Sequence, residues 1–319
     1  MSGCAKLANM VLNPSMPPEP PSDTWSQWLL HLRHGGDPAL RRAISPDLQV
    51  FADRVLDGAQ IAPGMTLADI GSGEGLVAFR AIERVGPALR VVLTDISVPM
   101  LHHAEARAKE LGIAAQCSFA TCGADKLDPI PGSSVDAVTT RAVLAYVADK
   151  QAALREFHRV LKPGGRLSIA EPIFQDDAFV ACALKTRVES QRAGHADPLQ
   201  PLLHRWKAAQ FPDTPEKMAA NPITNYSERM LFEWIRLAGF EQTHLELHID
   251  SVPAKFTSWQ AFLESSPHPW APPLADILTQ QFTAQERQVF ATAMRPMVES
   301  GQISTVMRTI YATAVKTAQ

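Results

Sequence analysis

The sequence predicts an α/β protein with a doubly wound sheet, and two observations support this fold class. Between residues 61 and 172, short apolar runs typical of strands alternate with segments of helical periodicity. The first of these runs ends directly in a glycine-rich turn. Alternation of strands and helices implies parallel strands whose two faces are covered by helices.

The composition is that of a globular chain with a substantial core. Of its 319 residues, 46% are hydrophobic and 20% are charged, whereas disordered chains are poorer in apolar residues. Lys and Arg number 30 against 33 Asp and Glu, which gives a formal net charge of −3. This near balance, without a basic stretch, argues against nucleic acid as a partner.

The four cysteines form no Cys-x-x-Cys pair and no zinc-type spacing with histidine, so we expect neither a metal site nor a disulfide framework. No apolar run approaches the roughly 20 residues that a membrane helix needs. The first 21 residues lack the basic start and apolar stretch of a secretory signal. We therefore expect a cytoplasmic protein without a membrane partner.

The chain is expected to begin with a flexible proline-rich arm, residues 1–21, because repeated proline forbids regular helix. Residues 22–60 then form an N-terminal helical cap. Its first helix can be capped by Asp23, places tryptophan and leucine side chains on one face, and stops at Gly35-Gly36. Its second helix is expected to run from about Pro46 to Leu56.

Residues 61–172 are expected to form the core, with five strands and three helices. The strands are short apolar runs, and the helices are longer and carry apolar residues at helical spacing. The expected strands are 65–70, 90–94, 116–120, 135–140 and 166–170, and the expected helices are 76–85, 99–111 and 150–161.

Beyond the core the chain is predicted to be mainly helical. Residues 173–235 form a helical insertion, whose last helix is capped by Ser227. Residues 236–319 return to the core with strands at 241–249 and 305–315, in which apolar and polar residues alternate. A second helical insertion, at about 253–300, separates these two strands.

The most informative segment is the turn that follows the first strand, Leu67-Ala68-Asp69-Ile70-Gly71-Ser72-Gly73-Glu74-Gly75. Three glycines at alternate positions allow unusual φ angles and a close approach of a ligand to the backbone. The next strand ends in Asp95, whose carboxylate is suited to accept hydrogen bonds from both hydroxyls of a ribose. Together they predict a nucleotide-like ligand, although a glycine turn alone is weak evidence.

The residues favour one nucleotide-like ligand over another. A dinucleotide fingerprint has glycine at the sixth position, where Leu76 stands, and lacks an acid two residues before its first glycine. Here Asp69 stands two residues before the first glycine, Gly71. A carboxylate at this place suits a ligand with an ammonium group and a sulfonium better than a pyrophosphate. S-adenosylmethionine is therefore the favoured ligand. A nicotinamide oxidoreductase and a catalytically silent nucleotide-binding interaction protein remain as alternatives.

The chain resembles the class I S-adenosylmethionine-dependent methyltransferases in three places. They are the turn Leu67–Gly75, Asp95 and the segment Leu161-Lys162-Pro163-Gly164-Gly165-Arg166. The resemblance implies a Rossmann-like seven-stranded sheet with an antiparallel last strand. It also implies that the insertion at residues 173–235 and the N-terminal cap form a lid over the acceptor. The residues implied for the cofactor are Asp69, Gly71, Ser72, Gly73, Gly75, Asp95, Ile96, Met100, Ala124, Asp125 and Arg141. The family's usual acid near the adenine is displaced here, and Asp125 is its candidate replacement.

By the same resemblance, the acceptor lies past the ends of the fourth and fifth strands. Arg141 follows the fourth strand, where its guanidinium could clamp a carboxylate. A local salt bridge to Glu171 or Asp149 is the alternative. Arg141, His204 and His31 are the candidate catalytic residues, since imidazole titrates near neutrality, although a lone histidine is more often structural. Residues expected to contact the acceptor are Tyr146, Glu171, Arg205, Trp28, His34 and Tyr226.

These observations predict a methyltransferase that converts S-adenosylmethionine to S-adenosylhomocysteine while methylating a small molecule or peptide. Oxygen is the expected acceptor atom, including a carboxylate oxygen that needs no base, in a natural-product tailoring step. Methylation at nitrogen, carbon or sulfur is the alternative. The insertion at about 253–300 either enlarges the acceptor cavity or forms a homodimer contact.

Overall fold

The computed structural model describes residues 22–190, 197–256 and 258–317, so the predicted arm at residues 1–21 lies outside the described residues. Seven strands form one sheet in the order β3-β2-β1-β4-β5-β7-β6. β7 pairs antiparallel with β5 and β6, and the other pairs are parallel. The predicted doubly wound fold with an antiparallel last strand is confirmed. The strands are β1 (Thr66–Ile70), β2 (Arg90–Asp95), β3 (Cys117–Thr121), β4 (Val135–Arg141), β5 (Leu161–Pro172), β6 (Glu241–Pro253) and β7 (Ser304–Val315).

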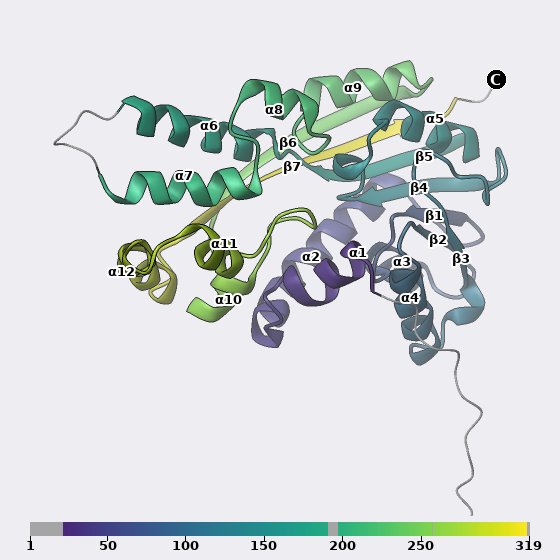
Figure 1. Ribbon diagram of the computed structural model, residues 1–319. Helices are drawn as coiled ribbons and strands as arrows, with labels where there is room; N and C mark the ends of the chain where they lie inside the picture. The colour runs from purple at the N-terminus through teal and green to yellow at the C-terminus, as the bar shows by residue number, and fades with distance from the viewer. Residues whose placement is uncertain (1–21, 191–196, 257, 318–319) are drawn as a thin grey trace, which may run out of the picture.

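Helices cover both faces of this sheet, and each face has its own apolar core (Figure 1). The helices on one face are α2 (Pro38–Ala59), α3 (Leu76–Val85) and α4 (Val98–Glu110), and those on the other are α5 (Lys150–Val160) and α9 (Glu228–Leu237). Within β1, Leu67 packs into the first core and Ala68 into the second. The strand is largely apolar because successive side chains point to opposite, equally buried faces.

Helix α2 begins well before Pro46, where the sequence predicted its start, and this prediction was wrong. Asp37 caps the helix, since its Oδ1 accepts a hydrogen bond from the Ala39 amide at 2.7 Å, and Pro38 occupies the first turn. Pro46 lies inside the helix but is exposed, so the carbonyl that it leaves without an intrahelical partner can bond to water. Residues Pro38–Ala59 therefore form one continuous helix against the sheet.

The two predicted helical insertions are not separate units, because helices from both share one apolar core, which includes Leu202, Phe262, Ile277 and Phe290. The helices of the two insertions are α6 (Gln175–Ser190), α7 (Leu199–Gln210), α8 (Pro215–Ala220), α10 (Trp259–Glu264), α11 (Leu274–Gln281) and α12 (Ala284–Glu299). α7 contacts α6 as well as α11 and α12 (Figure 1). α9, which the predicted first insertion included, packs on the sheet instead. In the described part of the chain, no helix is both long and apolar enough to cross a membrane.

Of the predicted N-terminal cap, α2 packs on the sheet, so the name is kept here for residues 22–36 alone. This shorter cap joins the helical layer to the sheet. α1 (Thr24–Gln27) continues into a wider helical turn, Trp28–Leu32. Its capping residue Asp23 accepts a hydrogen bond from the Ser97 hydroxyl at 3.0 Å, at the start of α4. At its other end, the Trp28 indole donates to the carbonyl of Ser266 at 3.1 Å. The cap is therefore held from two sides above the carboxyl ends of the strands.

Candidate active site

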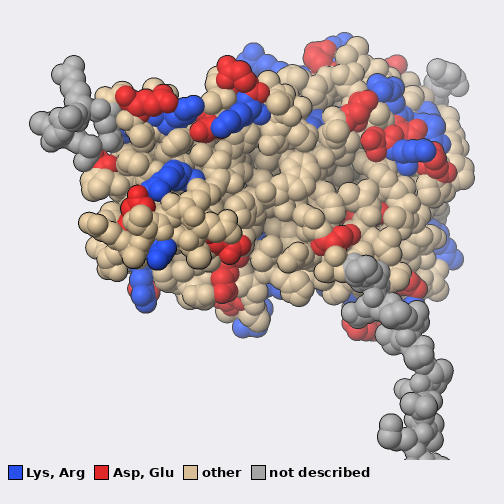
Figure 2. All heavy atoms as spheres, viewed as in Figure 1, with Lys and Arg blue, Asp and Glu red and all other residues tan. Residues whose placement is uncertain are grey.

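A cavity lies beneath the cap, at the carboxyl ends of β1, β2 and β4. The cavity is partly open to solvent, and about 1150 Å³ of empty space lies within and in front of it. The face shown in Figure 2 is hollowed at its centre, where few charged side chains lie, and Lys, Arg, Asp and Glu gather nearer its edges. The cavity is lined by Trp25, Trp28, Leu29, Arg33, Leu48, Asp69, Gly71, Ser72, Gly73, Glu74, Leu76, Val77, Asp95, Ile96, Cys122, Ala124, Arg141, Ala142, Val143, Tyr146 and Val147.

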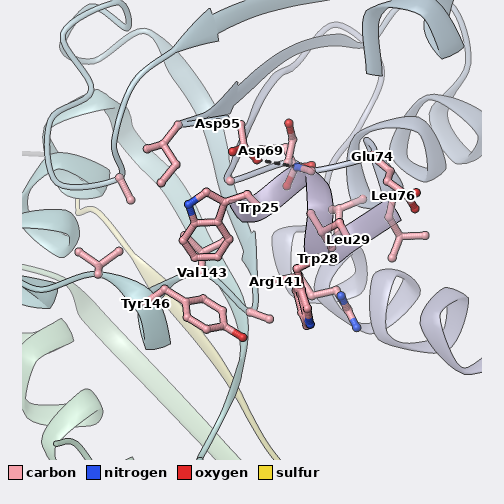
Figure 3. A pocket seen from close by; sticks show the side chains of 18 of the residues that line it. Trp25, Trp28, Leu29, Asp69, Glu74, Leu76, Asp95, Arg141, Val143 and Tyr146 are labelled. Atoms are coloured by element: carbon pink, nitrogen blue, oxygen red, sulfur yellow. Dashed lines mark hydrogen bonds between the residues drawn. The ribbon is translucent and has the colours of Figure 1, made fainter. Parts of the chain in front are cut away.

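The cavity has two chemically different ends (Figure 3). Asp69 and Asp95 lie at one end, and Arg141, Trp28 and Tyr146 lie at the other. The indole of Trp25 lies between them. One cavity therefore offers carboxylates at one end and a guanidinium with aromatic rings at the other.

The glycine turn forms the floor of the carboxylate end. Gly71 and Gly73 have φ angles of 65° and 52°, which side-chain-bearing residues rarely adopt. A Cβ atom on Gly71 would lie 2.5 Å from Val143 Cγ2, so the turn passes too close to the loop after β4 for any larger residue. The hydroxyl of Ser72 is buried without a hydrogen-bond partner in the described residues and lines the cavity. The turn therefore holds an unused polar group ready for a ligand.

Asp95 has the geometry to bind two hydroxyls. Its Oδ2 accepts a hydrogen bond from the Gly73 amide at 2.9 Å, and its Oδ1 accepts one from the Ser97 amide at 2.9 Å. A carboxylate has about four acceptor positions, so each oxygen retains capacity for a further hydrogen bond. Asp95 lines the cavity, and these two backbone amides hold its oxygens in place. This arrangement fits the 2′ and 3′ hydroxyls of a ribose.

Asp69 lies near the end of β1, where it is 2% exposed. Its Oδ1 accepts from the Thr139 hydroxyl at 2.9 Å, and its Oδ2 accepts from the Ala78 amide at 3.2 Å. Burial raises the pKa of this carboxyl to about 7, against the effect of both hydrogen bonds. A cationic group bound beside it would favour its ionised form, which is the chemistry expected for an ammonium ligand.

At the other end, Arg141 forms no salt bridge to either of the two carboxylates considered from the sequence. Glu171 is fully buried, and its oxygens accept from the Thr140 hydroxyl at 2.8 Å and from the Val143 amide at 3.0 Å. Asp149 caps α5 through the Ala152 amide. Arg141 Nε is buried without a hydrogen-bond partner in the described part of the chain. The alternative of a local salt bridge is therefore not what the structure shows.

Several residues predicted for the site do not line the cavity. They are Gly75, Met100, Asp125, Glu171, His31, His34, His204, Arg205 and Tyr226. Gly75 still belongs to the turn as the residue that starts α3. Glu171 supports the loop after β4 rather than contacting the cavity, and Tyr226 is buried with its hydroxyl donating to the Pro172 carbonyl at 2.6 Å.

Two of these residues, His204 and Arg205, bond within the helical layer instead. His204 Nε2 lies 3.1 Å from Asp213 Oδ2, and Arg205 donates to the Gln281 carbonyl at 2.8 Å and pairs with Glu286. Both residues are on α7, whose neighbours are α11 and α12. The structure therefore does not bring the predicted base His204 or the predicted acceptor contact Arg205 to the cavity.

The remaining histidines of the cap are also outside the cavity lining. His31 is exposed. Burial and the neighbouring Arg33 lower the pKa of His34 to about 4, so its imidazole is neutral at physiological pH. Trp28, Tyr146, Ile96 and Ala124, in contrast, line the cavity, and the roles predicted for them stay predictions.

The sequence analysis missed Trp25, Leu29, Glu74 and Val143 as cavity residues. The helical spacing of the cap's tryptophans and leucines did predict one buried face. It could not predict that this face covers a cavity rather than a core, because the cap is docked by contacts to serines far away in the sequence.

The fold brings a glycine turn and the acid that ends the second strand to one cavity, an arrangement typical of α/β proteins that bind a nucleoside-bearing ligand. The methyltransferase-domain family matches residues 61–218, about half of the chain. Through this domain the chain belongs to the class I S-adenosylmethionine-dependent methyltransferases, whose cofactor is S-adenosylmethionine.

Relatives of known name match the same core. The ubiquinone/menaquinone biosynthesis C-methyltransferase of Xanthomonas campestris is 42% identical over 113 residues, which are 35% of this chain and 44% of the relative. The nocamycin O-methyltransferase of Saccharothrix syringae is 38% identical over 122 residues, or 38% of this chain and 43% of the relative. Each match thus spans less than half of the relative's length.

A solved structure is similar over most of the chain. The YcgJ protein of Bacillus subtilis superposes with a TM-score of 0.54 at 17% identity, covering 85% of this chain and 99% of that one. At this level of identity the similarity shows the fold alone. The fold is therefore common to this chain and YcgJ, and the names of the two relatives that match the core do not assign an acceptor to this chain.

The raised pKa of Asp69 predicts a pH-dependent cofactor affinity. Its folded-state pKa of about 7 lies above the ordinary value of 3.8, so without ligand the group contributes stability at low pH that is lost as pH rises towards 7. Binding of a ligand ammonium needs the ionised carboxylate. We therefore expect S-adenosylhomocysteine to bind more tightly as pH rises from about 5.5 to about 7.5, with release of a proton on binding.

Asp69→Asn is the matched control for this prediction, since it keeps the shape but cannot ionise. Calorimetry at several pH values, with buffers of different ionisation enthalpy, would measure both the affinity and the released protons. The ratio of the two dissociation constants should change with pH. A ratio that stays constant would show that Asp69 is already ionised in the ligand-free protein.

Proposed function

We propose that this chain transfers a methyl group from S-adenosylmethionine to a small-molecule or peptide acceptor, with oxygen as the acceptor atom. A single observation carries the proposal. One cavity joins Asp69, the glycine turn and Asp95 to a second end that contains Arg141, Tyr146 and aromatic rings. The two ends would hold cofactor and acceptor next to each other, and positioning is the main task in a transfer of this kind.

Each residue of the carboxylate end has a distinct role in this proposal. When bound, S-adenosylmethionine supplies a methyl group made electrophilic by its positive sulfur. Asp95 would hold the ribose through its two free acceptor positions, and Asp69 would face the ammonium of the methionine part. The buried hydroxyl of Ser72 would gain a partner from the same ligand. The described residues thus fit this cofactor.

Oxygen is favoured as acceptor atom by the kind of residues that line the cavity. Neither histidine nor lysine is among the described lining residues, and Asp69 lies at the cofactor end. An acceptor that is already ionised needs no general base, and a carboxylate oxygen meets this condition at neutral pH. The similarity to an O-methyltransferase of nocamycin also supports a tailoring reaction, whereas the similarity to a C-methyltransferase keeps carbon as the alternative.

The proposal is tested by calorimetric titration of the purified protein with S-adenosylmethionine, S-adenosylhomocysteine and NAD. We expect micromolar binding of the two sulfur compounds and none of NAD. Methyl transfer is then followed with labelled S-adenosylmethionine and a panel of carboxylate, phenol, amine and thiol acceptors, including peptides.

The outcomes separate the competing functions. Binding of NAD in place of the sulfur compounds would favour an oxidoreductase. Tight binding of S-adenosylmethionine without transfer to any acceptor class would favour a catalytically silent binding protein. Label recovered in base-labile esters would support a carboxylate acceptor, whereas label on carbon or nitrogen would contradict the assignment of oxygen.

A further inference from the structure

Two guanidinium groups line the acceptor end of the cavity without a carboxylate partner. Arg33 comes from the cap and Arg141 from the end of β4. Neither forms an ion pair with any residue in the described ranges, although the same part of the chain contains many Arg–carboxylate pairs. Each lies near an aromatic ring instead: Arg33 is 5.4 Å from the ring centre of Trp28, and Arg141 is 5.4 Å from that of Phe51.

The carboxylates of the cavity are all engaged elsewhere. Asp69 and Asp95 accept hydrogen bonds from backbone amides at the cofactor end, and Asp69 also accepts one from a threonine. Glu74 pairs with Arg41. Just outside the lining, Glu171 bonds to the loop after β4. None of these four carboxylates therefore forms an ion pair with either arginine, although the charge of Glu74 acts favourably on Arg33 and that of Glu171 on Arg141.

The electrostatics of this end are unfavourable without a bound anion. Burial, together with the nearby charge of Arg33, lowers the pKa of Arg141 to about 9. Burial likewise lowers the pKa of Arg33; Tyr146 and Glu74 act in the opposite direction, and Arg41 adds to the lowering. Two like charges in a partly desolvated cavity repel each other and have lost hydration. A group that carries negative charge would reduce both penalties.

We propose that Arg33 and Arg141 together bind a carboxylate of the acceptor, which makes the substrate an organic acid. This inference rests on the proposed function and adds the chemical class of the acceptor. A carboxylate matches the planar fork of a guanidinium and can bond to two of them at once. Arg141 Nε, buried and without a partner among the described residues, is one donor available for it.

The rings around the two guanidiniums indicate the rest of the molecule. Trp25 and Tyr146 meet edge to face with ring centres 5.1 Å apart, and the ring of Trp28 faces Arg33. Such rings offer apolar contact area next to the charged groups. The acceptor is thus an acid whose carboxylate adjoins an aromatic or similarly apolar body.

The carboxylate of the cofactor's own methionine part is the competing occupant, and it must be tested separately. In Figure 3, Arg141 lies at the end of the cavity opposite both Asp95 and Asp69, the carboxylate that would face the methionine ammonium. This separation favours the acceptor side for Arg141. Methylthioadenosine, which keeps the nucleoside but lacks the amino-acid part, allows the two occupants to be distinguished.

The experiment uses the full chain and three pairs of probes. Phenylacetate, benzoate and indole-3-acetate are titrated by calorimetry into protein saturated with S-adenosylhomocysteine, each beside its uncharged amide. We expect at least one acid to bind about tenfold more tightly than its amide, the equivalent of one charge-assisted hydrogen bond. Arg33→Gln and Arg141→Gln should each abolish most of this preference. Arg295→Gln, which removes an exposed arginine of α12, should retain it.

Binding of S-adenosylhomocysteine and methylthioadenosine to each variant completes the experiment. If no acid binds better than its amide, or if both glutamine variants keep the preference, the proposal is overturned. It is also overturned if the variants lose affinity for S-adenosylhomocysteine but not for methylthioadenosine, since the arginines would then hold the methionine carboxylate. Failure of the wild-type protein to bind S-adenosylhomocysteine, measured first, would instead overturn the proposed function and this inference with it.

Discussion

Replacing Asp95 with alanine is expected to weaken binding of S-adenosylhomocysteine by about 100-fold or more. The carboxylate would accept two hydrogen bonds from the ribose, and bonds to a charged group contribute about 1.5–3 kcal/mol each. It also holds the amides of Gly73 and Ser97, so the glycine turn loses a support at the same time. Calorimetric titration of the variant measures the change directly.

Asp95→Asn is the control that separates these two contributions. The amide keeps the size of the side chain and one acceptor oxygen but loses the charge and the second acceptor. We expect an affinity between those of the wild-type protein and the alanine variant, with thermal stability close to wild type. An unchanged dissociation constant in both variants would remove Asp95 from the ribose-binding role.

Replacing Gly71 with alanine is expected to damage both stability and cofactor binding. A side-chain-bearing residue at a φ of 65° costs about 1–2 kcal/mol, and forced overpacking costs about 1–3 kcal/mol more. The added Cβ would lie 2.5 Å from Val143 Cγ2, so the turn or the loop after β4 must shift. Denaturant unfolding should show the sum of both costs, and affinity should fall roughly tenfold or more as turn hydrogen bonds are misplaced.

Gly112→Ala provides a matched control, since Gly112 has a φ of 70° but no described atom lies within 4 Å of the place that its Cβ would take. It should show the conformational cost alone and leave cofactor affinity unchanged. The double variant Gly71→Ala, Val143→Ala should recover part of the lost stability, because it removes the methyl groups in the way. Equal destabilisation by Gly71→Ala and Gly112→Ala would refute the argument from close approach.

The N-terminal cap forms part of the cavity wall, although it lies before the region that matches the family, which starts at residue 61. Trp25, Trp28, Leu29 and Arg33 come from this cap and line the cavity. The cap is docked by hydrogen bonds to serines of two distant segments. Its aromatic and cationic residues thus line one end of the cavity, while the core that matches the family supplies the carboxylates at the other end.

The fold and the carboxylate end of the cavity were predictable because both depend on short segments of sequence. Apolar runs of strand length and helices with one apolar face define the order of elements, and parallel strands bring their carboxyl ends to one edge. Asp69 and Gly71–Gly75 are nearly contiguous, and Asp95 ends the neighbouring strand, so the sheet alone places them together. The pairing of β1 with β2 needs no knowledge of the rest of the chain.

The acceptor end depended on packing between segments that are distant in sequence. His204 and Arg205 were reasonable candidates by residue type, but on α7 they bond to Asp213 and Glu286. The start of α2 was a similar case. Proline is common at helix starts, which led to the prediction at Pro46, but the exposed position of Pro46 allows α2 to continue on both sides of it. In each case the side chain's surroundings, rather than its chemistry, decided its place.

The amino-acid sequence alone was thus enough to predict the α/β class, the glycine turn and the two carboxylates that line one end of the cavity. That Arg33 and Arg141 line one cavity, with no described carboxylate in an ion pair with either, became visible only in the folded chain. A motif within one strand and its turn is fixed by local backbone geometry, which a sequence pattern encodes. A cavity wall built from a cap helix and a sheet edge is fixed by long-range packing, which no local pattern encodes.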